Sequence, residues 1–261
     1  MINKYSQEEI AILDEGGQLL SGILDEVAKM VSPEVTPKDL DAYAERRIRE
    51  VGGEPSFLHY QTDRRDPPFP STVCISLDEE VVHAPATPRR LTEGMLVKLD
   101  IGMRYRGLCT DMACTVPVGR ASREAAELVR VTREALLLAI EKCTVGNWVS
   151  DIGKAVDKHV RRHGFSTVKD LVGHGVGRHV HEEPRVPNYF DPSLRPVRLA
   201  PGMVLALEPM INAGRDAVSV KDDEWTVVTR DGRLSAHFEA TVALTESGTR
   251  VLTPIPPTAA G

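Results

Sequence analysis

The sequence has no long apolar segment at either end or in between. Its longest apolar stretches resemble residues 135–140, far short of the roughly 20 residues that a transmembrane helix needs. The N-terminus, MINKYSQEEI, also lacks the apolar core of a signal peptide. We therefore expect a cytoplasmic protein without a membrane partner.

Cysteine is scarce and an excess of positive charge is absent. The four cysteines show no CxxC spacing, which in a chain of 261 residues favours free thiols in a reducing compartment over a disulfide framework. The formal net charge is −6, and the charges are spread along the chain. This balance argues against nonspecific binding to nucleic acid, although it leaves a local basic patch open.

Helix signals come in two pairs. Apolar residues make up 41% of the chain, enough for one large domain with a sizeable core or for two small ones. A capping box predicts a helix after Ser6, and Pro37 predicts the start of a second helix that ends near Gly52. A second pair is predicted at 123–143 and from Ser150 to Gly164.

The two helix pairs resemble each other when the sequence is shifted by 112 positions, so that residue 37 meets residue 149. PKDLDAYAERRIREVG then lies over VSDIGKAVDKHVRRHG with its apolar face preserved. Chance similarity is the alternative, but we favour two duplicated α+β halves that pack their sheets together with the helices outside. We expect one domain over 1–252, with halves of about 1–120 and 121–252.

Short apolar runs predict strands between and after the helices, at 73–77, 95–103, 108–116, 203–211, 225–229 and 234–244. The dipeptide Asp231-Gly232 predicts a hairpin between the last two runs. The tail contains PIPPTAAG, which predicts that residues 253–261 are disordered.

Two aspartates lie in what reads as a hairpin. If its turn is centred between Tyr105 and Arg106, Asp100 lies opposite Asp111. Like charges in directly opposed positions destabilise a sheet, so something must compensate. A solvated edge would suffice, but the apolar neighbours suggest a buried sheet, and a divalent cation is the better candidate.

Two further acids, Glu208 and Glu239, also lie within apolar strands. A single buried acid usually belongs to a salt bridge, but four such acids together favour a metal site. With one histidine, the set is rich in oxygen and suits Mn²⁺, Fe²⁺ or Co²⁺ better than a structural zinc. Four carboxylates exceed the charge of one divalent ion, so we expect two ions roughly 3.5–4 Å apart.

The histidines come from the stretch GHGVGRHVHEEP at 173–184. Its glycines do not form GxGxxG, and no Lys-Ser or Lys-Thr follows them, so a phosphate loop is disfavoured. If the segment folds along the sheet, His174 and His181 both reach the acids. One of them would then ligate metal while the other polarises a substrate carbonyl.

Six motifs together resemble the type I methionine aminopeptidases over nearly the whole chain: VVH at 81–83, LDIG at 99–102, TD at 110–111, GHGVGRHVHEEP at 173–184, LEPM at 207–210 and HFEAT at 237–241. The resemblance implies the α+β pita-bread fold, in which two pseudo-symmetric halves share a central antiparallel sheet with helices outside. It implies an enzyme that removes the initiator methionine from nascent proteins with a small second residue.

The resemblance also implies roles for residues at matching positions. The metal ligands would be Asp100, Asp111, His174, Glu208 and Glu239, holding two ions of Co²⁺, Mn²⁺, Fe²⁺ or Zn²⁺. Glu208 would also shuttle a proton, His181 would stabilise the tetrahedral intermediate, and His83 would steer the substrate. The methionine pocket would be formed by Tyr60, Phe69, Cys74, Val180 and Trp225.

Two departures from the family pattern bear on specificity. Ala84-Pro85 follows the histidine of VVH where the family usually has glycine, and the loop from Tyr60 to Phe69 is longer than usual. A prolidase or aminopeptidase P on the same scaffold, or a non-catalytic binding protein, are the alternatives. The expected partners are N-termini of nascent polypeptides, with the ribosome as a further candidate, and we expect a monomer.

Overall fold

The computed structural model describes residues 2–61, 63 and 67–259. Its first two helices, α1 (Gln7–Met30) and α2 (Pro37–Glu50), begin where they were predicted, and both follow a capping box, of which the one at Ser6 was predicted. The Ser6 hydroxyl accepts a hydrogen bond from the Glu9 N–H, and the Glu9 carboxylate accepts one from the Ser6 N–H. Such reciprocal bonds satisfy N–H groups that have no partner inside the helix, which explains why the helix starts there.

The second pair consists of α3 (Arg123–Lys142) and α4 (Val149–Arg162). Helix α4 begins before Ser150, the residue expected to open it, because Trp148 occupies the N-cap position. The Trp148 N–H donates to the carboxylate of Asp151 at 3.0 Å. The acid three residues inside the helix therefore sets the start even though the cap residue has no hydroxyl.

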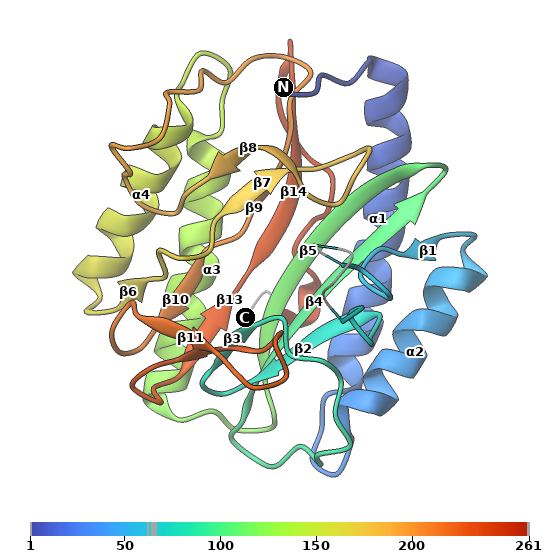
Figure 1. Cartoon of the computed structure of the whole chain (residues 1–261), viewed down its shortest axis with the longest axis vertical. Helices are drawn as coiled ribbons and strands as arrows, with labels where there is room; N and C mark the ends of the chain where they lie inside the picture. The colour runs from blue at the N-terminus through green and yellow to red at the C-terminus, as the bar shows by residue number, and fades with distance from the viewer. Residues whose placement is uncertain (1, 62, 64–66, 260–261) are drawn as a thin grey trace.

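A large antiparallel sheet runs through the molecule, with α1 and α2 over one half and α3 and α4 over the other (Figure 1). Within the described residues its main path is β1-β4-β5-β14-β9-β7-β8, with β2 on β4 and β15 on β14. The strands are β1 (Glu54–Pro55), β2 (Val73–Leu77), β4 (Leu96–Tyr105), β5 (Leu108–Pro117), β7 (Gly173–Gly175), β8 (Glu182–Val186), β9 (Val204–Leu207), β14 (Glu239–Thr245) and β15 (Gly248–Val251).

Two small sheets flank the large one. The first joins β13 (Ser235–His237), β10 (Met210–Asn212) and β6 (Ser166–Thr167), and the second joins β11 (Val218–Val220), β12 (Val227–Thr229) and β3 (Glu80–Val82). The hairpin expected at Asp231-Gly232 is wrong. Strand β12 is hydrogen-bonded to β11 and β3 on its two sides, so this turn connects two different sheets.

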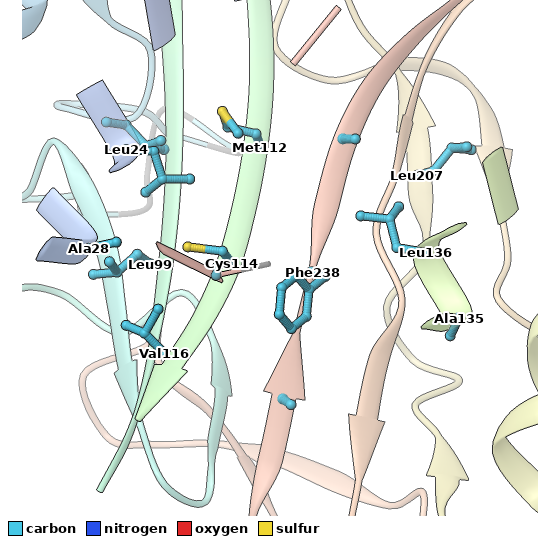
Figure 2. Close-up of a cluster of buried hydrophobic side chains, with 14 of the residues drawn as sticks. Leu24, Ala28, Leu99, Met112, Cys114, Val116, Ala135, Leu136, Leu207 and Phe238 are labelled. Atoms are coloured by element: carbon cyan, nitrogen blue, oxygen red, sulfur yellow. The ribbon is translucent and has the colours of Figure 1, made fainter. Parts of the chain in front are cut away.

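Side-chain alternation along the central strands separates core from site. Leu99 of β4 and Met112 of β5 point to the helix side, where they cluster with Leu24 and Ala28 of α1 (Figure 2). Burying a leucine side chain stabilises the fold by about 1.5–3 kcal/mol, so this face fixes the sheet against the helices. Successive residues of a strand point to opposite faces, and the acids of β4 and β5 therefore point away from the helices.

The hairpin of β4 and β5 has a different register from the predicted one. Its turn is Arg106-Gly107, where φ is 49° and 86°, and Asp100 therefore pairs with Ala113 while Asp111 pairs with Gly102. A two-residue turn with positive φ at both central positions suits glycine at the second of them. The predicted direct opposition of the aspartates is wrong: they are diagonal neighbours on one face.

The C-terminal segment is packed on the protein rather than disordered. Thr253 is buried and accepts a hydrogen bond from the Thr241 N–H at 2.7 Å, and Ser21 of α1 donates to the Pro254 carbonyl at 2.6 Å. A 3-10 helix, η1 (Pro257–Ala259), follows. These polar contacts overturn the prediction of disorder for 253–259, and residues 260–261 lie outside the described part of the chain.

Both pairs of helices precede strands of the large sheet, as the predicted halves at 1–120 and 121–252 require. The duplication itself stays a prediction, to be tested by superposing the halves. In the described chain no helix combines the length and the apolar character needed to cross a membrane.

Candidate metal centre

A cavity of about 290 Å³ lies on the face of the large sheet that carries the acids. It brings together residues from distant parts of the sequence, and all the predicted site residues except Val180 line it. The described lining consists of Phe57, Tyr60, Phe69, Cys74, His83, Asp100, Asp111, His174, His181, Glu208, Trp225 and Glu239.

Three carboxylates meet at the floor of this cavity. Asp100, Asp111 and Glu239 are 7%, 2% and 2% exposed, and each offers an oxygen within 4.8 Å of the others. They come from β4, β5 and β14, and Glu239 pairs with Ala113, which also pairs with Asp100. Adjacent strands of one sheet therefore place the three acids side by side.

A histidine and a fourth carboxylate complete the group. His174 lies on β7 and Glu208 directly follows β9; His174 Nε2 is 3.5 Å from Glu208 Oε1. One ligand atom each from His174, Glu208 and Glu239 lies within 4.8 Å of the others. His174 Nδ1 lies 2.9 Å from the Gly175 carbonyl, and an N–H donated there leaves Nε2 free to bind a metal.

Burial dominates the electrostatics of this group. It raises the pKa of Asp100 to about 7, and burial together with neighbouring carboxylates raises the pKa of Asp111 and Glu239 well above the usual range. Burial also lowers the pKa of His174 to about 3, so its imidazole is neutral. Without a cation, the charged carboxylates are unfavourable in this cavity.

Several buried oxygens of these acids lack a protein partner. Asp100 Oδ1, Asp111 Oδ1 and Glu239 Oε1 accept no hydrogen bond from any described residue. Buried polar atoms are nearly always paired, so three unpaired oxygens in one cluster point to a ligand. Hard and borderline divalent ions prefer oxygen with imidazole nitrogen, and this donor set fits them.

Two more histidines face the same space. His181 Nδ1 lies 2.9 Å from the Tyr60 hydroxyl, and its ring centroid is 4.6 Å from that of His174. His83 has a φ of 60°, a left-handed conformation that is uncommon outside glycine and often found at functional sites. Burial, and then His181, lowers the pKa of His83 to about 4, so both rings can serve as neutral hydrogen-bonding groups.

Two residues of β13 and β14 support the acids from behind, and of these the sequence reasoning missed Thr241. Thr241 Oγ1 accepts a hydrogen bond from the Asp111 N–H at 2.9 Å and donates to the Asp111 carbonyl at 2.7 Å. His237 Nε2 is 3.6 Å from Glu208 Oε2, in a fully buried position. The HFEAT motif holds both residues, but only the strand pairing brings them to their partners.

Aromatic rings form the wall beside the acids. Phe69 and Trp225 make an edge-to-face contact with ring centroids 5.2 Å apart, and Phe57, which the sequence did not suggest, joins Tyr60 in the lining. A Cβ on Gly102 would lie 2.9 Å from the Phe57 ring, so the glycine makes room for this aromatic residue. The result is an apolar compartment next to the charged one.

Val180 is the predicted pocket residue that lies outside this wall. It is buried in the hydrophobic cluster that also contains Phe57 and Phe69, without joining the described lining. Val180 lies in the loop between β7 and β8, and its side chain belongs to this cluster rather than to the cavity lining.

The glycines of 173–184 permit close packing of backbone rather than a phosphate cradle. A Cβ on Gly175 would lie 2.3 Å from the Glu183 carbonyl oxygen, and one on Gly177, where φ is 148°, would lie 2.2 Å from the Tyr5 hydroxyl. Tyr5 in turn donates to Glu182 at 2.8 Å and accepts from the Arg178 N–H. The N-terminal segment thus fixes the loop that carries the histidines.

The extended loop at 60–69 is closed at its base. The His59 N–H donates to the Phe69 carbonyl, and the Phe69 N–H donates to the Tyr60 carbonyl, both at 2.8 Å. These bonds hold Tyr60 and Phe69 at the cavity although the loop between them is long. Residues 62 and 64–66 of the predicted insertion lie outside the described part.

Nearly the whole chain is similar to known metallopeptidases. Residues 11–246 match the profile of metallopeptidase family M24. The methionine aminopeptidase of Clostridium perfringens is 41% identical over 253 residues, which cover 97% of this chain and 99% of the relative. The methionine aminopeptidase of Aquifex aeolicus is 42% identical over 254 residues, with 97% and 98% covered.

Solved structures show the same similarity in three dimensions. A methionine aminopeptidase from Thermotoga maritima superposes with a TM-score of 0.90 at 38% identity, covering 97% of this chain and 99% of that one. A prolidase from Pyrococcus furiosus gives a TM-score of 0.76 at 22% identity, covering 96% of this chain and 65% of that one, which shows a shared fold alone. The predicted pita-bread fold is confirmed.

Proposed function

Since this chain belongs to metallopeptidase family M24, we propose that its metal ligands are Asp100, Asp111, His174, Glu208 and Glu239. The observation that carries the proposal is the cluster of buried carboxylate oxygens without described hydrogen-bond partners. Each has a lone pair available, and a cation would relieve the mutual repulsion of the acids.

As a metallopeptidase the protein uses divalent metal, and we propose that it holds two ions. The set offers four carboxylates against the two positive charges of a single ion. Co²⁺, Mn²⁺, Fe²⁺ and Zn²⁺ all accept oxygen with one imidazole, so any of them fits the donors. When bound, such ions polarise a substrate carbonyl and lower the pKa of water.

The other groups of the cavity would move protons and hold the substrate. Burial raises the pKa of Glu208 well above its usual range, which suits a carboxyl that accepts and returns a proton. If the Tyr60 hydroxyl donates to His181 Nδ1, Nε2 of that ring carries the proton and can donate to a developing oxyanion. His83, neutral and held at the cavity by its backbone, would orient the amide that is cleaved.

The enzyme is an aminopeptidase that removes N-terminal methionine. We propose that its substrates are nascent chains with a small second residue. The apolar wall of Phe57, Tyr60, Phe69 and Trp225 suits an unbranched thioether side chain, because sulfur and aromatic rings attract each other by about 0.3–1.5 kcal/mol. Cys74, a protonated thiol at the same wall, adds a soft apolar contact.

A peptide panel tests the assignment. Protein freed of metal and reloaded with Mn²⁺ or Co²⁺ should hydrolyse Met-Ala-Ser, and a chelator should abolish this activity. Ala-Pro and Gly-Pro peptides should resist cleavage, and preferential cleavage of them would favour a prolidase. Asp111→Asn should lose metal and activity while its circular dichroism spectrum stays that of the parent.

Partners and location extend the proposal. We propose that the protein acts as a cytoplasmic monomer on the N-termini of emerging polypeptides, with the ribosome as a further partner. Gel filtration tests the monomer, and co-sedimentation with translating ribosomes tests the contact. Activity on free peptides does not depend on either result.

A further inference from the structure

We propose that Glu134, His159 and His163 form a second metal site on the outer helix pair, for a borderline divalent ion such as Zn²⁺, Ni²⁺ or Cu²⁺. Each of the three residues offers a ligand atom within 4.8 Å of the other two. Glu134 belongs to α3, whereas His159 and His163 belong to α4 and its C-cap. None of the three is among the described residues that line the cavity.

The spacing of the two histidines favours shared coordination. Residues four apart on a helix lie on the same face, one turn above each other. The rings of His159 and His163 accordingly have centroids 4.9 Å apart and are tilted by 56°. Two imidazoles at this spacing can bind one ion without any change of the backbone, and the adjacent helix supplies the carboxylate.

The contact between His159 of α4 and Glu134 of α3 is as short as a hydrogen bond, but its angles do not meet the criteria for one. His159 Nε2 is 3.2 Å from Glu134 Oε2, yet this nitrogen is buried and forms no hydrogen bond with any described group. In a metal site both atoms direct their lone pairs at a common point, so neither points at the other. Burial, and then the neighbouring His163, lowers the pKa of His159, which keeps its imidazole neutral as a ligand must be.

The first helix pair shows a different way to join two helices. There Arg47 of α2 donates to Glu26 of α1 at 2.7 Å, a cation bonded to a carboxylate. At α3 and α4 two imidazoles lie beside the carboxylate in place of a guanidinium. A divalent ion held by all three side chains would join both helices, as the guanidinium of Arg47 joins α1 and α2.

The surrounding charges modulate the site. Arg130 donates to Glu134 Oε1 at 2.5 Å and also pairs with Glu127, while Glu127 Oε1 is 3.3 Å from His163 Nδ1. The guanidinium opposes a second cation and lowers the affinity, but it leaves Glu134 Oε2 available. Two nitrogens and one carboxylate oxygen resemble zinc sites with an open position, which water fills at this partly exposed surface.

The experiment counts bound zinc on the full chain. Equilibrium dialysis against buffered Zn²⁺, followed by metal analysis, would compare the parent with His163→Ala and with His179→Ala. Both variants lose an exposed histidine, but only His163→Ala should lose one zinc equivalent per chain. Crystals soaked in Zn²⁺ should show an anomalous peak between α3 and α4 in the parent and none there in His163→Ala.

A second variant separates metal binding from a purely structural role. Arg130→Gln removes ion pairs and yet should bind the outer zinc more tightly, because the competing cation is gone. Asp111→Asn should lose metal from the cavity and keep the outer ion, so failure of one site is distinguishable from failure of the other. Equal zinc content in the parent and His163→Ala, or a peak at another place, would overturn the proposal.

Discussion

The metal-free protein should lose stability as the pH rises above about 6.5. Burial raises the pKa of Asp100 to about 7, and raises those of Asp111, Glu208 and Glu239 well above their usual values. Above about pH 4 the folded chain therefore binds more protons at these groups than the unfolded chain does. Between its unfolded-state pKa and its raised folded-state pKa, each of these carboxyls lowers the free energy of unfolding by about 1.4 kcal/mol for every unit by which the pH rises.

The buried histidines have the opposite effect and define the useful pH window. Burial lowers the pKa of His83 to about 4 and those of His174 and His237 to about 3, so unfolding below about pH 6.5 lets these imidazoles take up protons. This uptake offsets the protons that the carboxyls release. Above about pH 6.5 the imidazoles are neutral in both states, so we expect a plateau followed by a decline.

Urea unfolding from pH 5 to 8, in the presence of a chelator, measures this profile. The stability of Asp111→Asn should decline less steeply, because the amide cannot ionise and does not repel the neighbouring carboxylates. Asp222→Asn removes the same charge from an exposed position and should keep the parent's slope. A flat profile of the metal-free parent from pH 6.5 to 8 would refute the reasoning. Saturating Mn²⁺ should reverse the slope, since metal binding needs ionised carboxylates.

Four further substitutions test individual contacts. His174→Ala should lower metal content together with activity, whereas His181→Ala should keep its metal and lower kcat by roughly 10²–10³-fold, as metal analysis with peptide kinetics would show. Thr241→Val removes both hydroxyl bonds to the Asp111 backbone and should destabilise the fold by about 1–3 kcal/mol in urea unfolding; an unchanged midpoint would contradict this. Gly102→Ala places a Cβ 2.9 Å from an aromatic ring and should cost about 1–3 kcal/mol, measured the same way.

Many of the residues that line the cavity could be predicted from the sequence, because patterns within a few residues determine where helices start and which strand residues share a face. The capping box at Ser6 and the proline at position 37 identify helix starts from residues within one turn. Strand alternation predicts which side chains share a face. The turn of the β4–β5 hairpin was misplaced by one residue, which moves each cross-strand partner by two and preserves its face. Asp100 and Asp111 therefore point into one cavity in either register.

Contacts between segments far apart in the chain could not be predicted in this way. The pairing of Thr241 with the Asp111 backbone depends on β14 lying beside β5, and no local pattern encodes that neighbour. Thr253 was assigned to a disordered tail because proline-rich ends usually lack partners, yet it binds the backbone of Thr241. Phe57 reaches the cavity only because Gly102 on a neighbouring segment lacks a side chain.

The two faces of the central strands have opposite effects on the stability of the fold. On the helix side, Leu99 and Met112 bury apolar surface and stabilise the sheet. On the other side, Asp100 and Asp111 are desolvated next to each other, which destabilises the metal-free fold at neutral pH. Selection for stability alone would favour apolar or amide side chains at both acidic positions. The proposed metal site would explain their presence, and on that proposal neutral substitutions there should leave a folded, more stable and inactive protein.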